Sequence, residues 1–292
     1  MKKQHTSHLK LKIPSRRIIA ASLFVAILAF TGLWFLAFSK ASTYVVAIEA
    51  ESGTRSGGAT QVSDSGASNG SSVKFATATT PPITPPPATP KTIKLMPLGD
   101  SITLGSDGGY RTQLWQKMVQ TDGKKIDFVG SLTDGPSSLG DRNHEGHSGW
   151  RIDQLRAQID GWSNSYKPNL VLLHIGTNDM NQNYNLSAAP SRLQDLVNRI
   201  CSQNAGVELI VASIVPINGK SSQVNAYNSA IPGIVDNAKG AGCKASFFDM
   251  NKSLTTSDLA DGTHPSISGY NKMAAAWYPV ANAAYDRLQA IN

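Results

Sequence analysis

Acidic residues are absent from positions 1–48 of this 292-residue chain, and no basic patch stands out in the rest. Seven of the 27 lysines and arginines fall within those 48 positions, so the remaining 20 cations balance the 20 acidic residues. A nucleic-acid-binding domain concentrates positive charge on its folded part. The position of the +7 net charge therefore excludes a nucleic-acid partner and indicates a targeting segment at the N-terminus.

Charge of either sign is also absent from Ile18 to Phe38, where the only polar interruptions are two hydroxyls and a glycine. As a helix this run would span about 31 Å, the thickness of a bilayer core. We therefore expect a basic cytoplasmic tail over residues 1–17, a single transmembrane anchor over 18–38, and an extracytoplasmic, cell-surface location for everything after Lys40. A signal peptide is the alternative, because Ser39-Lys40-Ala41 resembles a cleavage site; the protein would then be secreted after cleavage near Ala41.

Cysteine is scarce, with only Cys201 and Cys243 in the chain. Two cysteines in an exported protein fit an oxidising compartment. Cys201 is predicted near the end of one helix and Cys243 just after the next, and crossover helices on one face of a parallel sheet end close together. A disulfide and a pair of buried free thiols both remain open at this point.

Two low-complexity segments follow the apolar run. Residues 41–75 are rich in Ser and Gly and resemble a truncated carbohydrate-binding module, but such a β-sandwich needs ~100 residues. A stalk with strand-like pieces at 44–48 and 72–75 is therefore expected. Residues 76–91 contain six prolines, which predicts a semi-rigid polyproline spacer.

From residue 92 onward, short apolar runs alternate with longer helix-like stretches. The predicted strands are Ile93–Leu98, Ile126–Val129, Leu170–Ile175, Leu209–Val215 and Ala245–Phe248. The predicted helices are Tyr110–Gln120, Arg151–Trp162, Ala188–Asn204, Ser221–Lys239 and Ser266–Ala290. Because the strands lack strict polar alternation and the connections have crossover length, we expect one α/β domain with a mostly parallel sheet covered on both faces. Ligands of such sheets lie beyond the carboxyl ends of the strands.

Four short blocks supply the groups that acyl transfer by a serine needs. They are Gly99-Asp100-Ser101, Gly146-His147-Ser148-Gly149, Gly176-Thr177-Asn178-Asp179 and Asp261-Gly262-Thr263-His264. Ser101 follows the first predicted strand and needs a base to become a nucleophile. His264 is the candidate base, and Asp261 in the same loop is the candidate carboxylate that orients it. The alternative for Asp261 is a helix cap, although Ser266 and Ser268 lie nearer the start of the final helix.

Three groups are candidate donors to a tetrahedral oxyanion: the backbone N–H of Ser101, the backbone N–H of Gly149 and the side-chain amide of Asn178. A simple turn role is the alternative for Asn178. Tyr110 and Trp150 flank the blocks. They form either a sugar-stacking substrate rim or packing against the first helices.

A metal site is not predicted. His144 and His147 bracket Glu145, but Gly146 disfavours the helix that a His-Glu-x-x-His zinc site requires. His174 falls inside a predicted strand and is expected to be a core residue whose hydrogen bonds are satisfied.

Together the four blocks resemble the SGNH (GDSL-type) hydrolase superfamily, across residues 92–292. By match, the signature positions and the triad carboxylate are Ser101, Gly149, Asn178, His264 and Asp261. Within the superfamily, residues 143–153 and Tyr227-Asn228 look like carbohydrate esterase family 3, the acetyl xylan esterases. The resemblance implies a flavodoxin-like three-layer α/β/α sandwich with a five-stranded parallel sheet, deacetylation of plant polysaccharide, and no cofactor.

We therefore expect a serine esterase that removes O-acetyl groups from polysaccharide through an acetyl-enzyme intermediate. The alternatives are an O-acetylesterase of peptidoglycan or another envelope glycan, a lipase or lysophospholipase of the same superfamily, and a non-catalytic glycan-binding surface protein. No long apolar lid segment lies between the blocks, which argues against the lipase. The complete set of triad and oxyanion residues argues against the non-catalytic protein.

Overall fold

The computed structural model describes residues 54, 59–67, 70–74 and 89–290. By their contacts the residues fall into two compact units, Met1–Thr84 and Pro85–Asn292. The predicted tail and membrane anchor, the predicted strand 44–48 and most of the proline-rich spacer lie outside the described residues. Within the described part of the chain, no helix is both long enough and apolar enough to cross a membrane.

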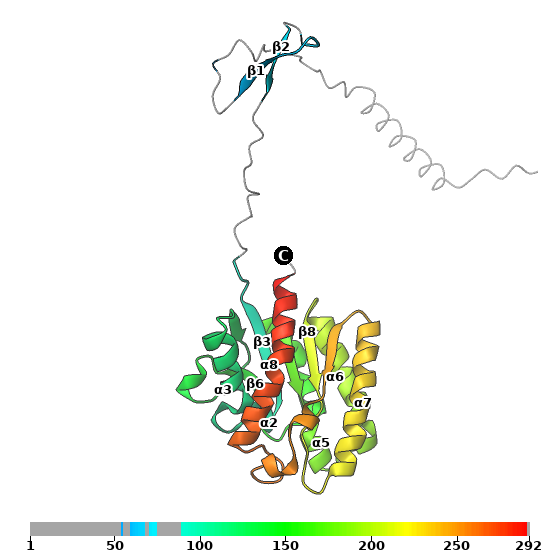
Figure 1. Cartoon of the computed structure of the whole chain (residues 1–292). Helices are drawn as coiled ribbons and strands as arrows, with labels where there is room; N and C mark the ends of the chain where they lie inside the picture. Colours follow the sequence, from blue (N-terminus) through cyan, green and yellow to red (C-terminus); the bar gives the residue numbers. More distant parts are fainter. Residues whose placement is uncertain (1–53, 55–58, 68–69, 75–88, 291–292) are drawn as a thin grey trace, which may run out of the picture. The chain divides into compact units, whose positions relative to one another are not determined.

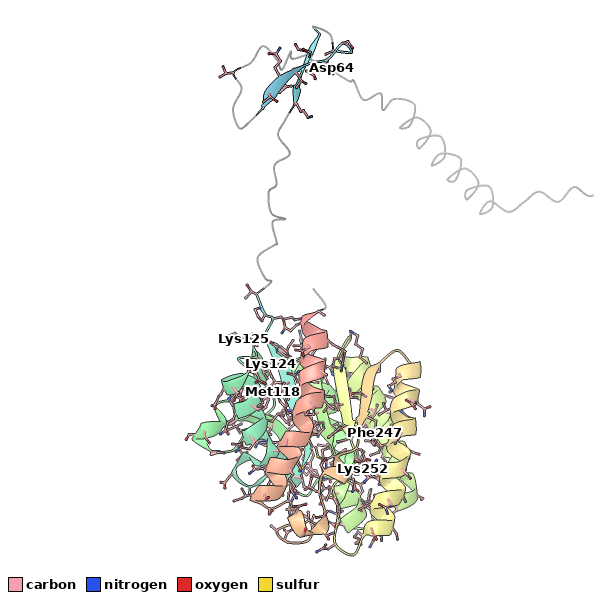
Figure 2. All side chains as sticks on the ribbon, viewed as in Figure 1. Asp64, Met118, Lys124, Lys125, Phe247 and Lys252 are labelled. Carbon is pink, nitrogen blue, oxygen red and sulfur yellow. A yellow bond between two sulfur atoms is a disulfide. The ribbon has the colours of Figure 1, made fainter. Side chains whose placement is uncertain are left out.

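The first unit contains an antiparallel pair of strands, β1 (Thr60–Ser63) and β2 (Ser71–Lys74). The connection between them begins at Asp64, whose Oδ1 accepts the backbone N–H of Gly66 at 3.0 Å (Figure 2). β2 corresponds to the strand-like piece predicted at 72–75. β1 was not predicted, because its exposed Thr-Gln-Val-Ser sequence carries little apolar signal.

A seven-stranded sheet forms the centre of the second unit. Its strands are β3 (Ile93–Asp100), β4 (Ile126–Phe128), β5 (Leu132–Thr133), β6 (Asn143–His147), β7 (Leu170–His174), β8 (Glu208–Ala212) and β9 (Lys244–Phe248). Their order is β5-β6-β3-β7-β8-β9, and β4 pairs with the first residues of β3. All pairings are parallel except the two-residue pairing of β5 with β6. The five-stranded parallel sheet that the resemblance implies is therefore wrong in strand number and at this antiparallel edge, whereas the mostly parallel sheet expected from the strand pattern is confirmed.

Strand β6 escaped prediction because it contains no apolar residue. Its His144 and Glu145 are nevertheless fully buried. Glu145 Oε1 accepts the backbone N–H of Ser131 at 2.6 Å, and His144 Nδ1 accepts the N–H of Gly146 at 2.9 Å. Both side chains thus form hydrogen bonds with backbone groups in a buried strand that carries no apolar residue, so hydropathy does not reveal it.

Five long helices cover the two faces of the sheet (Figure 1). They are α3 (Gly109–Trp115), α4 (Ile152–Tyr166), α6 (Ala189–Gln203), α7 (Ser221–Gly240) and α8 (Ile267–Gln289). Met96 and Leu98 of β3 pack with α4, α6 and α7, whereas Ile93 and Leu95 pack with α3 and α8. This alternation is the two-residue period of a strand buried on both sides. The predicted α/β architecture with helices on both faces is confirmed.

The predicted helix 110–120 divides into α3 and a π-helical turn, Gln116–Thr121. Lys124 follows this turn and reaches the last turns of α8 (Figure 2). Its Nζ lies 2.9 Å from Asp286 Oδ1 and 4.3 Å from the ring centroid of Tyr285. These contacts fasten α8 beside the start of the sheet.

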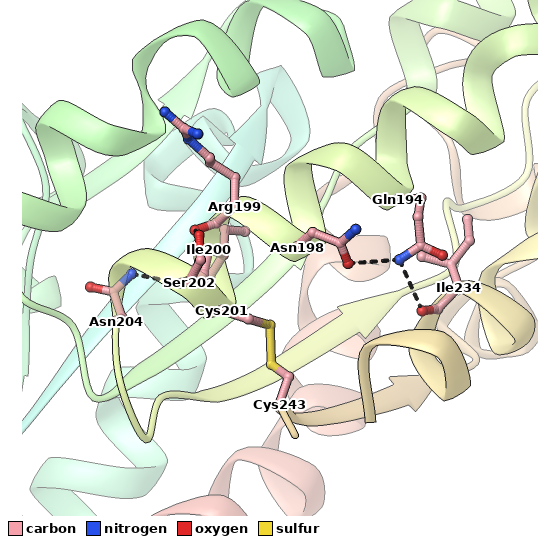
Figure 3. Close-up of a disulfide and its surroundings, with 9 residues drawn as sticks. All are labelled: Gln194, Asn198, Arg199, Ile200, Cys201, Ser202, Asn204, Ile234 and Cys243. Carbon is pink, nitrogen blue, oxygen red and sulfur yellow. Dashed lines mark hydrogen bonds between the residues drawn. A yellow bond between two sulfur atoms is a disulfide. The ribbon is translucent and has the colours of Figure 1, made fainter. Parts of the chain in front are cut away.

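Cys201 on α6 and Cys243 at the start of β9 form a disulfide, with their Cα atoms 5.7 Å apart (Figure 3). Helices α6 and α7 lie in the same core cluster, so their ends are neighbours as expected. Of the two alternatives that the sequence leaves open, the structure has the disulfide. It lies where β9 begins, at the edge of the sheet opposite the carboxyl ends of the strands.

Candidate active site

Strand β3 delivers Ser101 to the carboxyl edge of the sheet, where it starts the one-turn helix α2 (Ser101–Leu104). Asp100 caps this helix, because its Oδ1 accepts the backbone N–H of Ile102 at 3.0 Å. A Cβ on Gly99 would overlap the backbone oxygen of the neighbouring strand β7. Glycine is therefore required where the strand passes into the helix, and the serine is held beyond the sheet.

His264 and Asp261 reach Ser101 from the loop that precedes α8. Ser101 Oγ lies 2.8 Å from His264 Nε2, and His264 Nδ1 lies 2.7 Å from Asp261 Oδ2. Asp261 Oδ1 also accepts the backbone N–H groups of His264 at 2.7 Å and of Thr263 at 2.9 Å. Hydrogen bonds from the His264 backbone and ring lower the pKa of Asp261 to about 2. An ionised carboxylate at neutral pH favours a proton on Nδ1, so Nε2 can accept from the serine hydroxyl.

The loop 261–264 is fastened by neighbouring segments. Asn218 donates its backbone N–H to the glycine carbonyl of this loop at 2.8 Å, and Asn181 Nδ2 donates to its threonine hydroxyl at 3.3 Å. Ser266 is the residue that caps α8, accepting the N–H three residues later at 3.1 Å. The Asp261 carboxylate is therefore free of the capping role and available to the histidine.

Gly149 lies in a tight turn directly after β6. The backbone N–H of Trp150 donates to the carbonyl of His147 at 3.2 Å, and Gly149 at the third position of this turn has φ +79°. A positive φ at this position is what a type II turn demands, and it favours glycine. No atom lies within 4 Å of where a Cβ would stand, so the space beside this backbone is open.

Asn178 belongs to the short helix α5 (Thr177–Asn181), which follows β7. Its Nδ2 donates to the backbone carbonyl of Trp150 at 2.9 Å. An amide nitrogen carries two hydrogens, so the second remains available to a ligand. This bond ties the Asn178 side chain to the residue that directly follows Gly149.

Asp179, the next residue, was not singled out from the sequence although it lies within one of the four blocks. It is fully buried, and its Oδ2 accepts the backbone N–H of Ile152 at 3.1 Å. Its Oδ1 lies 2.7 Å from Arg192 Nη2 on α6. Two adjacent side chains of α5 thus hold the backbone between Gly149 and α4, which keeps two of the three predicted oxyanion donors, Gly149 and Asn178, on one rigid unit.

The predicted substrate rim is wrong for Tyr110. This side chain is fully buried, with its ring centroid 5.9 Å from that of Trp277 in the core. Trp150 is partly exposed, and its ring stacks on His147 with centroids 4.2 Å apart. Trp162 stacks on the same histidine at 4.8 Å. The glycine turn therefore rests on an aromatic stack that also restrains Trp150.

His174 is fully buried in β7, as expected. Burial lowers the pKa of His174 to about 4, which keeps the ring neutral. In β6, His147 Nε2 lies 2.7 Å from Glu145 Oε2. Among the residues that the structure describes, no three His, Cys, Asp or Glu side chains are grouped to hold a metal ion.

The sequence profile of the GDSL-like Lipase/Acylhydrolase family matches residues 98–272, more than half of the chain. The chain belongs to this family. Membership confirms the resemblance of the four blocks to GDSL-type hydrolases, and it makes the second unit of this acylhydrolase a carboxylic ester hydrolase.

Several relatives of this acylhydrolase bear the names of carbohydrate esterases. A solved family 3 carbohydrate esterase of Clostridium thermocellum is 40% identical with a TM-score of 0.62, covering 68% of this chain and 100% of that one. A family 3 carbohydrate esterase of Talaromyces cellulolyticus is 29% identical with a TM-score of 0.61, covering 67% of this chain and 99% of that one. A multidomain esterase of Ruminococcus flavefaciens is 31% identical over 217 residues, which are 64% of this chain but 28% of that protein.

Proposed function

We propose that this acylhydrolase is a carbohydrate O-acetylesterase that removes acetyl groups from polysaccharide. The hydrogen-bonded series Asp261–His264–Ser101 carries the proposal, because it joins a nucleophile, a base and an orienting carboxylate at 2.8 and 2.7 Å. The likeness of the whole second unit to family 3 carbohydrate esterases supports the acetylated-sugar substrate.

In the proposed reaction, Ser101 Oγ attacks the acetyl carbonyl carbon while His264 Nε2 takes the hydroxyl proton. Asp261 holds the imidazole and stabilises its positive charge. The tetrahedral oxyanion accepts hydrogen bonds from the N–H groups of Ser101 and Gly149 and from the free amide hydrogen of Asn178. Collapse breaks the ester bond, and the sugar oxygen leaves with the proton from His264.

The second half of the reaction uses the same groups in reverse. Water attacks the acetyl-enzyme and gives a proton to His264. The second oxyanion collapses, acetate leaves, and the proton returns to Ser101 Oγ. Every proton passes through one imidazole, so no cofactor enters this scheme.

We further propose that the enzyme works outside the cytoplasm. The Cys201–Cys243 disulfide supports this location, because such bonds persist in oxidising compartments. Residues 1–17 would be a cytoplasmic tail and 18–38 an anchor. The stalk of residues 41–75 and the spacer of 76–91 would then carry the esterase unit of 92–292 away from the membrane.

Acetate release from acetylated xylan, with Ser101→Ala as control, tests the reaction. We expect the full chain to release acetate and the variant to lose at least about a thousandfold in rate, because the nucleophile is missing. Circular dichroism should show the variant folded, since Ser101 makes no core contact. Retained activity in the variant would remove Ser101 as the nucleophile.

Two further substrates separate the alternatives. Release of acetate from acetylated peptidoglycan but not from xylan would indicate that the substrate is an envelope glycan. A membrane anchor favours this outcome. Faster cleavage of octanoyl than of acetyl esters would favour a lipase. Binding to glycan without any hydrolysis would favour a non-catalytic surface protein.

A further inference from the structure

Among the described residues of the second unit, two large apolar side chains are strongly exposed, Tyr184 at 40% and Ile267 at 70%. Tyr184 comes six residues after Asn178, and Ile267 comes three residues after His264. Helices α2, α5 and the first turn of α8 all lie at the same end of the unit (Figure 1). Exposed apolar residues scattered singly are ordinary, but these two stand in the two segments that carry Asn178 and His264.

The backbone around Tyr184 is held in an unusual conformation. Asn183 and Asn185 on either side have φ values of +51° and +38°, a left-handed region that non-glycine residues seldom adopt. Lys220 Nζ donates to Asn183 Oδ1 at 2.9 Å, and Arg192 donates to the carbonyls of Tyr184 at 2.9 Å and Asn185 at 3.2 Å. Such a backbone persists only when its surroundings hold it, and it recurs at ligand contacts. The loop therefore presents the tyrosine in a fixed position.

The two guanidiniums at the Tyr184 ring are each paired with a carboxylate. The guanidinium carbons of Arg151 and Arg192 lie 4.1 and 4.9 Å from the ring centroid. Arg151 pairs with Asp153 at 3.2 Å, and Arg192 pairs with Asp179 at 2.7 Å. An aromatic edge among hydrogen-bonding groups without net charge suits a neutral sugar, whose ring offers both C–H groups and hydroxyls.

We propose that Tyr184 and Ile267 contact the neutral sugar residues on either side of the acetylated one, Tyr184 beside Asn178 and Ile267 beside His264. The inference rests on the proposed deacetylase function and adds to it the residues that select a polymer over a small ester. A neutral backbone such as xylan is the occupant, because both guanidiniums at the ring are already paired with carboxylates.

The test compares two substrates in full-length Tyr184→Ala and Ile267→Ala. The readout is the ratio of kcat/KM for acetylated xylan to kcat/KM for p-nitrophenyl acetate, which lacks flanking sugars. We expect each variant to lower this ratio about five- to tenfold, the size of a lost aromatic or aliphatic contact. Tyr166→Ala should keep the wild-type ratio, because Tyr166 is the last residue of α4 and lies at the end of that helix remote from Trp150. An unchanged ratio in both site variants would overturn the inference.

A binding measurement separates this inference from the proposed reaction. In the Ser101→Ala background, affinity electrophoresis through acetylated xylan should retard the protein, and adding Tyr184→Ala should reduce the retardation. Retardation that depends on Tyr184, in an enzyme that releases no acetate from xylan, would uphold the surface and refute the reaction. Cleavage of xylan without any effect of Tyr184 or Ile267 would uphold the reaction and refute the surface. If only an acidic polysaccharide, and not acetylated xylan, retarded the protein, the proposal that the ligand is a neutral sugar would be refuted.

Discussion

At the scale of single residues, Asp100 stands directly before Ser101 with its carboxyl fully buried. One oxygen caps α2 and so orients Ser101. Burial raises the pKa of Asp100 to about 6, and hydrogen bonds from the Ile102 N–H and the Thr177 side chain offset this effect only in part. The carboxylate that caps α2 therefore destabilises the folded protein when it is ionised.

Asp100→Asn should stabilise the enzyme at alkaline pH. The native pKa of about 6, against 3.8 for an ordinary aspartate, means that ionisation costs the fold about 3 kcal/mol above pH 6. This cost vanishes below about pH 4, where the carboxyl is protonated in both states. The amide keeps an oxygen acceptor for the Ile102 N–H, so urea unfolding at pH 8 should show a gain of about 2–3 kcal/mol.

The same unfolding measured at pH 4 should show little gain for Asp100→Asn. Asp107→Asn, which changes an exposed carboxyl nearby, should have no comparable effect at either pH. An equal change at pH 8 and pH 4 would mean that packing of the amide, and not the charge, decides the result.

At the scale of elements, the positions of the proposed oxyanion donors Gly149 and Asn178 depend on the hydrogen bonds that hold helix α5 to the start of α4. Asn178 holds the carbonyl of Trp150 and Asp179 holds the N–H of Ile152. Asp179 also anchors Arg192, and Arg192 in turn holds the Tyr184 loop. A single buried carboxylate therefore connects the catalytic segment to the proposed sugar contact.

Asp179→Asn should lower kcat more than it raises KM, because it loosens the donors that act in the transition state. It also leaves Arg192 without its charge partner, which should cost about 3 kcal/mol in unfolding free energy. Steady-state kinetics on p-nitrophenyl acetate and urea unfolding measure the two effects. Asp160→Asn is the control, since it breaks a half-exposed ion pair that also ends on α6, from Asp160 of α4 to Arg199. The control should cost less than about 1 kcal/mol and leave kcat unchanged.

The disulfide acts on stability and lies far from the reaction. It bridges residues 42 positions apart, so the loop-closure estimate for replacing both cysteines with serine is a loss of about 4 kcal/mol. Because Cys243 lies where β9 begins, at the opposite edge from Ser101, activity at 25 °C should persist. Urea unfolding measures the loss of stability, and p-nitrophenyl acetate turnover measures the activity. A large loss of kcat in the folded variant would contradict the statement that the disulfide does not affect the reaction.

At the scale of the whole molecule, the chain enters the second unit at the end opposite the proposed active site. The backbone of Lys91 exchanges hydrogen bonds with the side chain of Gln289 at 2.9 and 2.6 Å, just before β3 begins. Ser101 stands at the far end of that strand. The proposed stalk and anchor would therefore join this unit away from the proposed active site.

Deleting residues 1–41 should move the activity from the membrane fraction of expressing cells to the soluble fraction. The physical reason is the loss of a charge-free run long enough to cross a bilayer. Fractionation followed by p-nitrophenyl acetate assay measures the change, and kcat should equal that of the full chain. If the undeleted chain is already soluble and begins near Ala41, the segment is a cleaved signal peptide instead of an anchor.

Local sequence by itself determined the strands with apolar runs, the long helices and the four blocks, because each depends on nearby periodicity or on a glycine-bounded turn. Tertiary structure alone decided β6, the burial of Tyr110 and the role of Asp179. Strand β6 is buried although it has no apolar residue, so its sequence does not mark it as a strand. The sequence around Tyr110 would be the same whether its ring faced the core or the solvent. Asp179 acquires its role from Ile152 and Arg192, which the chain brings near it only by folding. Contacts between distant segments leave no local pattern, and the oxyanion geometry consists largely of such contacts.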